Sequence, residues 1–212
     1  GTGEIDVATT GVGNFDVTYT TVGTCPTSST ISIDITASPD ATFSYSASPY
    51  CQIGTATITF GPGASGGVFS EATGDVSINT STGEVDLSSS IPGIYTVEND
   101  IAASGGCAAA NATTTIEILA ADNPDYSYSS VAECQSGTDI SATITGTAGG
   151  FSFSPAGLSI DPTSGLIDVS ASADGVYDVT YTTTGACPAD STLSITITAD
   201  DDASYSYSSL AE

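Results

Sequence analysis

Five cysteines carry the most distinctive chemistry in this chain of 212 residues. Cys25, Cys107 and Cys187 recur at intervals of about 80 residues, and Cys51 and Cys134 recur at the same interval. Two thiols within reach of each other can be oxidised to a disulfide, and thiolates can also bind zinc. Zinc is disfavoured because the chain has no histidine and no Cys-x-x-Cys pair. The cysteines therefore predict disulfides, with five buried free thiols as the alternative.

Aspartates form a second group with metal-binding chemistry. They cluster at three places in the sequence, and the candidates are Asp40, then Asp122 and Asp125, then Asp200, Asp201 and Asp202. Carboxylate oxygens are hard ligands that suit Ca²⁺, and the chain has no Lys or Arg to neutralise them. We expect these clusters to hold structural Ca²⁺. The alternative is a solvated acidic linker, because no Ca²⁺-loop motif is present.

Three short motifs are candidates for glycan attachment. Asn79 and Asn111 each begin an Asn-x-Ser/Thr sequence. Ser191, in Asp190-Ser191-Thr192, is similar to the acidic Ser/Thr sites that carry O-glycans in some surface proteins of Bacteroidetes. Such short motifs also arise by chance in a chain rich in Ser and Thr, so the three sites are predictions.

Two apparent enzyme motifs fail on their surroundings. Gly63-Ala64-Ser65-Gly66-Gly67 fits the G-x-S-x-G pattern, but a serine nucleophile needs a base and the chain has neither His nor Lys. Residues 61–66 fit a dinucleotide-binding glycine pattern, but no helix is predicted to follow. A carboxylate pair could hydrolyse glycosides, yet sugar sites use aromatic platforms and Trp is absent. We predict no catalytic residues and no required cofactor.

The composition excludes whole classes of partner. With 25 acidic residues and no Lys or Arg, the formal net charge is −25. Nucleic acids and anionic membrane surfaces both need Lys or Arg, so both are excluded as partners. No run of apolar residues approaches the roughly 18 needed to span a membrane. The start, Gly1-Thr2-Gly3-Glu4, lacks the basic region of a signal peptide, and we expect a mature segment from which any targeting sequence has been removed.

The sequence repeats with a period of about 80 residues. Residues 78–88 match 160–170, residues 16–21 match 178–183, and residues 41–46 match 203–208. The repeats predict two complete domains, at 40–121 and 122–200. Residues 1–39 are then the C-terminal part of an incomplete repeat, and residues 201–212 are the first strand of a following one. The alternative is a two-domain protein with ragged ends.

The local pattern of each repeat is that of β-strands. Leu193, Ile195 and Ile197 alternate with polar residues, which is the signature of a half-buried strand. Residues 161–165 place Pro and Gly where a turn needs them. No segment shows helical periodicity. About seven short strands in about 80 residues predict an antiparallel β-sandwich.

Residues 157–167, followed by 175–181, resemble the Ig-like and cadherin-like repeats of large bacterial extracellular surface proteins. This resemblance implies an all-β chain of tandem Ig-like antiparallel β-sandwich domains at the cell surface or outside the cell. The function it implies is a non-catalytic structural part of a fibre, stalk or surface layer, assembled head-to-tail from copies of the chain. The alternative is an adhesin that recognises a carbohydrate or a protein through its loops.

An extracellular location favours oxidised cysteines. Equivalence between repeats predicts the intradomain pairs Cys51–Cys107 and Cys134–Cys187, each closing a loop of about 55 residues and contributing about 4 kcal/mol. Cys25 is left over, and we expect its partner to lie outside residues 1–212.

Tyrosines open each repeat, and they are candidates for contacts between domains or subunits. They are Tyr45, Tyr126, Tyr128, Tyr205 and Tyr207. The alternative is ordinary packing within an edge strand.

Residues 1–39 lack the strands that would complete a sandwich. Leaving Ile31, Ile33 and Ile35 in water would forfeit on the order of 1.5–3 kcal/mol each. We therefore expect these residues to be covered by other chain, either a preceding part of the same polypeptide or a neighbouring copy.

Overall fold

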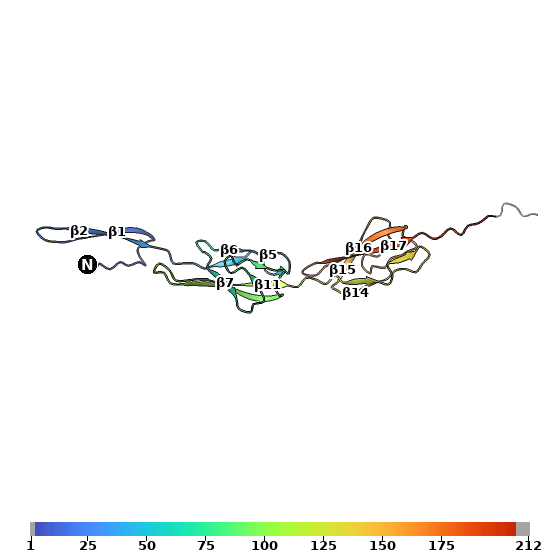
Figure 1. Cartoon of the computed structure of the whole chain (residues 1–212), viewed down its shortest axis with the longest axis horizontal. Coiled ribbons are helices and arrows are strands. Elements are labelled where there is room, and N and C mark those ends of the chain that lie inside the picture. Colours follow the sequence, from blue (N-terminus) through green and yellow to red (C-terminus); the bar gives the residue numbers. More distant parts are fainter. Residues whose placement is uncertain (1–2, 207–212) are drawn as a thin grey trace, which may run out of the picture. The chain divides into compact units, whose positions relative to one another are not determined.

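A computed structural model describes residues 3–206 of the chain. Every regular element within that range is a β-strand, which confirms the all-β prediction. The chain divides into two compact units, Gly1–Ile118 and Leu119–Glu212 (Figure 1). The finer division into segments at 39/40, 121/122 and 200/201 stays a prediction. Residues 201–206 contain no strand, and the rest of the strand expected at 201–212 lies outside the described residues.

The first unit begins with an antiparallel hairpin, β1 (Gly13–Thr20) and β2 (Ser28–Ile35), in which Gly13 pairs with Ile35 and Thr20 with Ser28. The nine strands that follow form what we call the first sandwich. They are β3 (Phe43–Tyr45), β4 (Tyr50–Cys51), β5 (Thr55–Ala56), β6 (Ile58–Phe60), β7 (Val68–Glu71), β8 (Ser77–Ile78), β9 (Val85–Asp86), β10 (Gly93–Ile101) and β11 (Ala110–Leu119).

The first sandwich contains a four-stranded sheet in the order β4-β11-β10-β7. Smaller sheets, β3-β6 and β5-β9-β8, make up the rest. Its core comes from side chains that alternate along the long strands, so that Val97 on β10 and Ile116 on β11 are fully buried against Phe69 and Val85. The alternation of apolar and polar residues that the sequence predicts therefore places the apolar side chains of these strands in the core.

The second unit holds the second sandwich. Its strands are β12 (Tyr126–Tyr128), β13 (Ala132–Cys134), β14 (Ala142–Ile144), β15 (Gly149–Ser154), β16 (Gly175–Thr183) and β17 (Asp190–Thr198). They form a four-stranded sheet, β13-β17-β16-β15, and a separate pair, β12-β14. The edge strand β13 runs parallel to β17, with Ala132 opposite Thr196 and Cys134 opposite Thr198. The other pairings are antiparallel.

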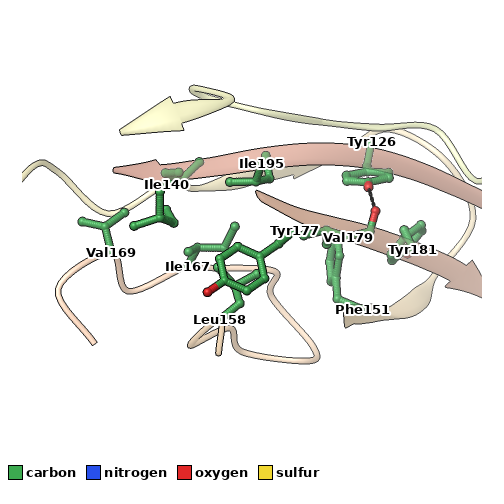
Figure 2. Packing of buried hydrophobic residues seen from close by; sticks show 11 residues of the cluster. Tyr126, Ile140, Phe151, Leu158, Ile167, Val169, Tyr177, Val179, Tyr181 and Ile195 are labelled. Carbon is green, nitrogen blue, oxygen red and sulfur yellow. Dashed lines mark hydrogen bonds between the residues drawn. The ribbon is translucent and has the colours of Figure 1, made fainter. Parts of the chain in front are cut away.

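Figure 2 shows the core of the second sandwich, where side chains from β16 and β17 meet side chains from residues 126–169. Val179, Tyr181 and Ile195 have no exposed surface. The hydroxyl of Tyr126 donates a hydrogen bond of 2.6 Å to the carbonyl of Val179. A buried Tyr needs such a partner, because a hydroxyl removed from water without one is costly.

The turn predicted at 161–165 forms. The Oδ1 atom of Asp161 accepts hydrogen bonds from the amides of Thr163 (2.9 Å) and Ser164 (2.7 Å), and Gly165 has a φ of 71°. These bonds favour the ionised carboxylate and lower the pKa of Asp161. Asn79 makes the same kind of turn in the first sandwich, where its Oδ1 accepts from Ser81 and Thr82. The turn thus needs a side-chain oxygen but no charge.

Candidate functional site

The β1–β2 hairpin shares its sequence with strands that are buried in the second sandwich, but its own apolar side chains are largely exposed. The hexapeptide Asp-Val-Thr-Tyr-Thr-Thr begins at Asp16 in β1 and at Asp178 in β16. In the second sandwich its valine and tyrosine, Val179 and Tyr181, are 0% exposed. In the hairpin the same residue types are 37% exposed (Val17) and 72% exposed (Tyr19). Identical sequence therefore has opposite burial in the two places.

The second strand of the hairpin shows the same contrast. Ile33 and Ile35 on β2 are half-buried and Ile31 is 63% exposed, whereas Ile195 and Ile197 on β17 are buried. Phe15, Val17, Tyr19, Ile31, Ile33 and Ile35 make up what we call the hairpin apolar face. In the second sandwich, residues 126–169 pack against β16 and β17. No described residue of the chain covers the hairpin apolar face in this way.

The opposite, polar face of the hairpin already has the geometry of a finished sheet. The hydroxyls of Thr18 and Thr30 lie 2.7 Å apart, and those of Thr180 and Thr192 on β16 and β17 lie 2.8 Å apart. Ser32 donates a hydrogen bond to Asp16, just as Ser194 donates one to Asp178. The polar face of the hairpin thus matches that of β16 and β17, and the two hairpins differ in the burial of their apolar faces.

The cysteines occupy the two ends of each sandwich. Cys134 is exposed and lies opposite Thr198, the last residue of β17. Cys187 is 2% exposed in the loop before β17, and its carbonyl accepts a 2.9 Å hydrogen bond from the amide of Asp122, where the chain enters the second sandwich. The two cysteines therefore lie at opposite ends of β17.

The predicted intradomain disulfides are wrong. Cys107 and Cys134 are free thiols, so neither Cys51–Cys107 nor Cys134–Cys187 forms. The eight steps of β17 from Asp190 to Thr198 separate the two ends of the second sandwich by roughly 26 Å, whereas a disulfide needs Cα atoms about 4.4–6.8 Å apart. Equivalence between repeats identified the cysteines but not the end of the domain at which each one lies.

The remaining cysteines lie at or near the hairpin. Cys25 is an exposed free thiol in the connection between β1 and β2, and the prediction of a partner outside the chain stays a prediction. The Sγ atom of Cys107 lies 3.3 Å from Oγ1 of Thr36 and 3.7 Å from the carbonyl oxygen of Ala37, within unit 1. A groove of about 280 Å³ lies at this point, lined by Cys107, Thr36 and Ala37 among others.

Several of the predicted calcium ligands accept hydrogen bonds from other groups of the protein. Asp40 accepts from the amide of Thr42 (2.8 Å), and Asp200 accepts from the amide (3.0 Å) and the hydroxyl (2.7 Å) of Ser136. Hydrogen bonds from Ser204 lower the pKa of Asp202, as expected for a stabilised carboxylate.

The aspartates at the start of the second sandwich behave differently. Asp125 contributes its backbone carbonyl to the amides of Thr145 (3.0 Å) and Gly146 (3.1 Å). Asp122 has one carboxylate oxygen that is buried without a hydrogen-bond partner. Within residues 3–206, no three residues among His, Cys, Asp and Glu gather closely enough to hold a metal ion. Binding of Ca²⁺, including by Asp201, stays a prediction.

The three candidate glycan sites differ in accessibility. Asn79 is exposed in a turn, where its side-chain Oδ1 atom accepts hydrogen bonds from the amides of Ser81 and Thr82. Asn111 is exposed on β11, but its Nδ2 atom donates to Glu98 and, at 2.7 Å, to Asp100. Ser191 is half-buried on β17. A glycan is attached through the amide nitrogen of asparagine, so Asn79 is the better placed of the two asparagines, and all three sites stay predictions.

The tyrosines that open the repeats pack mostly within their own sandwich. Tyr45 donates to the carbonyl of Gly83 (2.9 Å), and Tyr126 and Tyr128 make an edge-to-face pair with centroids 5.6 Å apart. Burial raises the pKa of Tyr45 and of Tyr128. These contacts support the ordinary-packing alternative for those three residues. Tyr205 is 81% exposed, and Tyr207 lies outside the described residues.

Comparison with known proteins finds likenesses in structure alone. No protein-family model matches the chain, and no curated protein matches it. Among solved structures, mouse cadherin-23 EC22–24 is 18% identical over 93% of this chain and 77% of its own, with a TM-score of 0.33. Protocadherin gammaB7 EC3–6, solved as a cis-dimer, is 15% identical over 92% of this chain and 61% of its own, with a TM-score of 0.39.

A third likeness is to the insect immune protein hemolin, which is 14% identical over 86% of this chain and 56% of its own, with a TM-score of 0.35. The similar structures are cadherin and Ig-like extracellular domains. At these TM-scores they carry no argument about function. Within residues 3–206, no helix is present that is long and apolar enough to cross a membrane.

Proposed function

We propose that the chain is a non-catalytic structural component of an extracellular fibre, stalk or surface layer, assembled head-to-tail from copies of itself. The observation that carries this proposal is the hairpin apolar face. Val17 and Tyr19 are exposed there, although the same hexapeptide is fully buried in β16. Folded proteins rarely leave a contiguous apolar face and open strand edges in water, so this face is a surface for assembly.

The second sandwich shows what kind of layer would cover the face. There, Tyr181 packs against Phe151 and Tyr126, with ring centroids 4.7 Å and 5.6 Å apart, and Ile167 and Val169 complete the same core. Phe151 lies beside Tyr181 on the neighbouring strand of the same sheet, whereas Tyr126, Ile167 and Val169 lie outside that sheet. We propose that another copy in the fibre contributes apolar side chains that cover the hairpin apolar face in a comparable way.

The charge of the chain limits how copies can join. Both partners carry acidic groups and neither carries Lys or Arg, so no salt bridge between such side chains can hold them together. Apolar contact and strand pairing must provide the attraction, while dissolved ions at 0.1 M ionic strength screen the repulsion between charges more than about 10 Å apart. Assembly should accordingly strengthen as salt rises from low to moderate concentration.

Sedimentation of the intact chain over a range of concentrations tests the proposal. Val17→Asp places a charge on the hairpin apolar face, and Val22→Asp is the matched control because Val22 is 99% exposed outside that face. Wild type and the control should form concentration-dependent polymers that appear as filaments by negative stain. The Val17→Asp variant should remain smaller at every concentration.

Two results would overturn head-to-tail assembly. One is a wild-type chain that stays monomeric at every concentration and salt. The other is a polymer that tolerates Val17→Asp as well as it tolerates Val22→Asp.

A further inference from the structure

We infer that residues 204–212 of one copy form the strand that covers the exposed part of the hairpin apolar face in the next copy. This inference rests on the head-to-tail assembly proposed above and names the part of the partner that makes the contact. Its basis is residues 125–133 of the second sandwich, which have nearly the same sequence and pack on the strands equivalent to the hairpin.

The two segments have matching sequences. Residues 126–130 read Tyr-Ser-Tyr-Ser-Ser, and residues 205–209 read the same. Residues 131–133 read Val-Ala-Glu where residues 210–212 read Leu-Ala-Glu, so that one aliphatic residue replaces another. Residues 203–211 carry no charge, in a chain with a net charge of −25. Docking them therefore brings no carboxylate against an apolar surface, which would be costly.

Tyr126 shows how this segment packs in the second sandwich. Its ring centroid lies 5.6 Å from that of Tyr181. Its hydroxyl donates 2.6 Å to the carbonyl of Val179 and accepts 3.1 Å from the amide of Leu193 (Figure 2). Tyr126 is 9% exposed, and Phe43, at the corresponding place in the first sandwich, is also 9% exposed. One aromatic side chain of the segment thus becomes part of the core and binds both strands of the pair beneath it.

The hairpin presents counterparts of the same three partners. Val17 lies opposite Ile31 just as their counterparts on β16 and β17 lie opposite each other, and Tyr19 is the counterpart of the third. Val17, Tyr19 and Ile31 are the exposed members of the hairpin apolar face, whereas its other members are half-buried. A Tyr205 ring placed as Tyr126 is placed covers these three, and its hydroxyl bonds to the carbonyl of Val17 and the amide of Ile31.

The end of the segment matches an open edge of the hairpin. In the second sandwich, β13 runs parallel to β17, with Ala132 opposite Thr196. Among the described strands, β1 and β2 pair only with each other, so the corresponding edge of β2 is available. The shared register makes Asp34 the counterpart of Thr196, which places Ala211 of the docked segment opposite Asp34. Backbone hydrogen bonds at such an edge add affinity to the apolar contact.

Single charges on opposite sides of the segment test the inference. Tyr205→Asp places a carboxylate where the ring enters the hairpin apolar face. Ser206→Asp is the matched control, because it adds the same charge at a position whose counterpart, Ser127, is exposed. By sedimentation of the intact chain, Tyr205→Asp should raise the concentration needed for polymerisation by at least about tenfold. Ser206→Asp should remain within about twofold of wild type.

Mixing two blocked variants tests the direction of the contact. The Val17→Asp chain has a blocked hairpin and an intact segment, and the Tyr205→Asp chain has the reverse. Neither should polymerise alone. An equimolar mixture should contain a heterodimer and no larger species, because only one intact hairpin and one intact segment can join. Hairpins that paired with each other, or a segment that covered the hairpin of its own chain, would produce no such heterodimer.

The outcomes separate this inference from the proposed assembly. If Tyr205→Asp polymerises as readily as Ser206→Asp while Val17→Asp does not polymerise, the docking of residues 204–212 is overturned and head-to-tail assembly stands. Absence of the heterodimer from the mixture also overturns the docking. If wild type stays monomeric, or if Val17→Asp polymerises like wild type, the proposed assembly fails and the docking between copies fails with it.

Discussion

Tyr19 and Tyr181 offer a direct test of the hairpin apolar face, because they occupy the same place in the same hexapeptide. Replacing Tyr181 by alanine should strongly destabilise the second sandwich at any protein concentration. Replacing Tyr19 should leave the dilute monomer unchanged and should weaken only the assembled form. The difference arises because Tyr181 is 0% exposed whereas Tyr19 is 72% exposed.

The expected magnitude follows from what Tyr181 contacts. Its ring packs 4.7 Å from that of Phe151 and 5.6 Å from that of Tyr126, and its hydroxyl donates 2.8 Å to the carbonyl of Thr147. Truncating a buried aromatic side chain costs about 3–5 kcal/mol. For a domain of about 80 residues, each 1 kcal/mol lowers the melting temperature by about 4–8 °C, so Tyr181→Ala should lower it by at least about 12 °C. Tyr19→Ala should change the free energy of unfolding by less than about 0.5 kcal/mol in dilute solution.

Calorimetry and near-ultraviolet circular dichroism suit this protein, since it has ten Tyr and no Trp. Melting would be followed for wild type, Tyr19→Ala and Tyr181→Ala, both in dilute solution and at a concentration at which wild type polymerises. The reasoning is refuted if the two substitutions have equal effects in dilute solution. It is also refuted if Tyr19→Ala melts like wild type when wild type is polymeric, because the face would then remain uncovered in the assembly.

Three further predictions concern charge and modification. The pKa of Asp161 is lowered in the folded state by hydrogen bonds from Ser164 and Thr163, so its stabilising contribution is present above the unfolded pKa of about 3.9 and is lost as pH falls through the folded value. Asp161→Asn should keep the turn, as Asn79 does in the first sandwich, and should make urea unfolding less sensitive to pH below about 4; an unchanged acid profile would contradict this. Adding Ca²⁺ should raise the melting temperature by more than an equal ionic strength of Na⁺, whereas identical melting in Ca²⁺ and in chelator at moderate salt would remove the calcium prediction. Mass spectrometry of material from the native source should find glycan at Asn79 in preference to Asn111, and the reverse order would show that the Nδ2 bonds of Asn111 do not protect it.

The strands and turns of this protein could be predicted from local sequence. Ile195 and Ile197 alternate with polar neighbours and lie buried on β17, because side chains of a strand point alternately to its two faces. The turn at Asp161 follows from the αL conformation at Gly165 and from the capacity of the Asp side chain to accept the two next amides. Such features depend on neighbours a few residues apart, which the sequence displays directly.

The burial of the hairpin and the pairing of the cysteines depend on contacts distant in sequence, and there the tertiary structure decided. Val17 and Val179 have identical neighbours and opposite exposure, because burial is set by the layer packed against a strand and not by the strand. The order of cysteines in a repeat suggested intradomain bonds. The parallel pairing of β13 with β17, however, places Cys134 roughly 26 Å from the end of the sandwich that holds Cys187. Sequence alone determined that these residues recur, and the topology of the sheet determined which of them can meet.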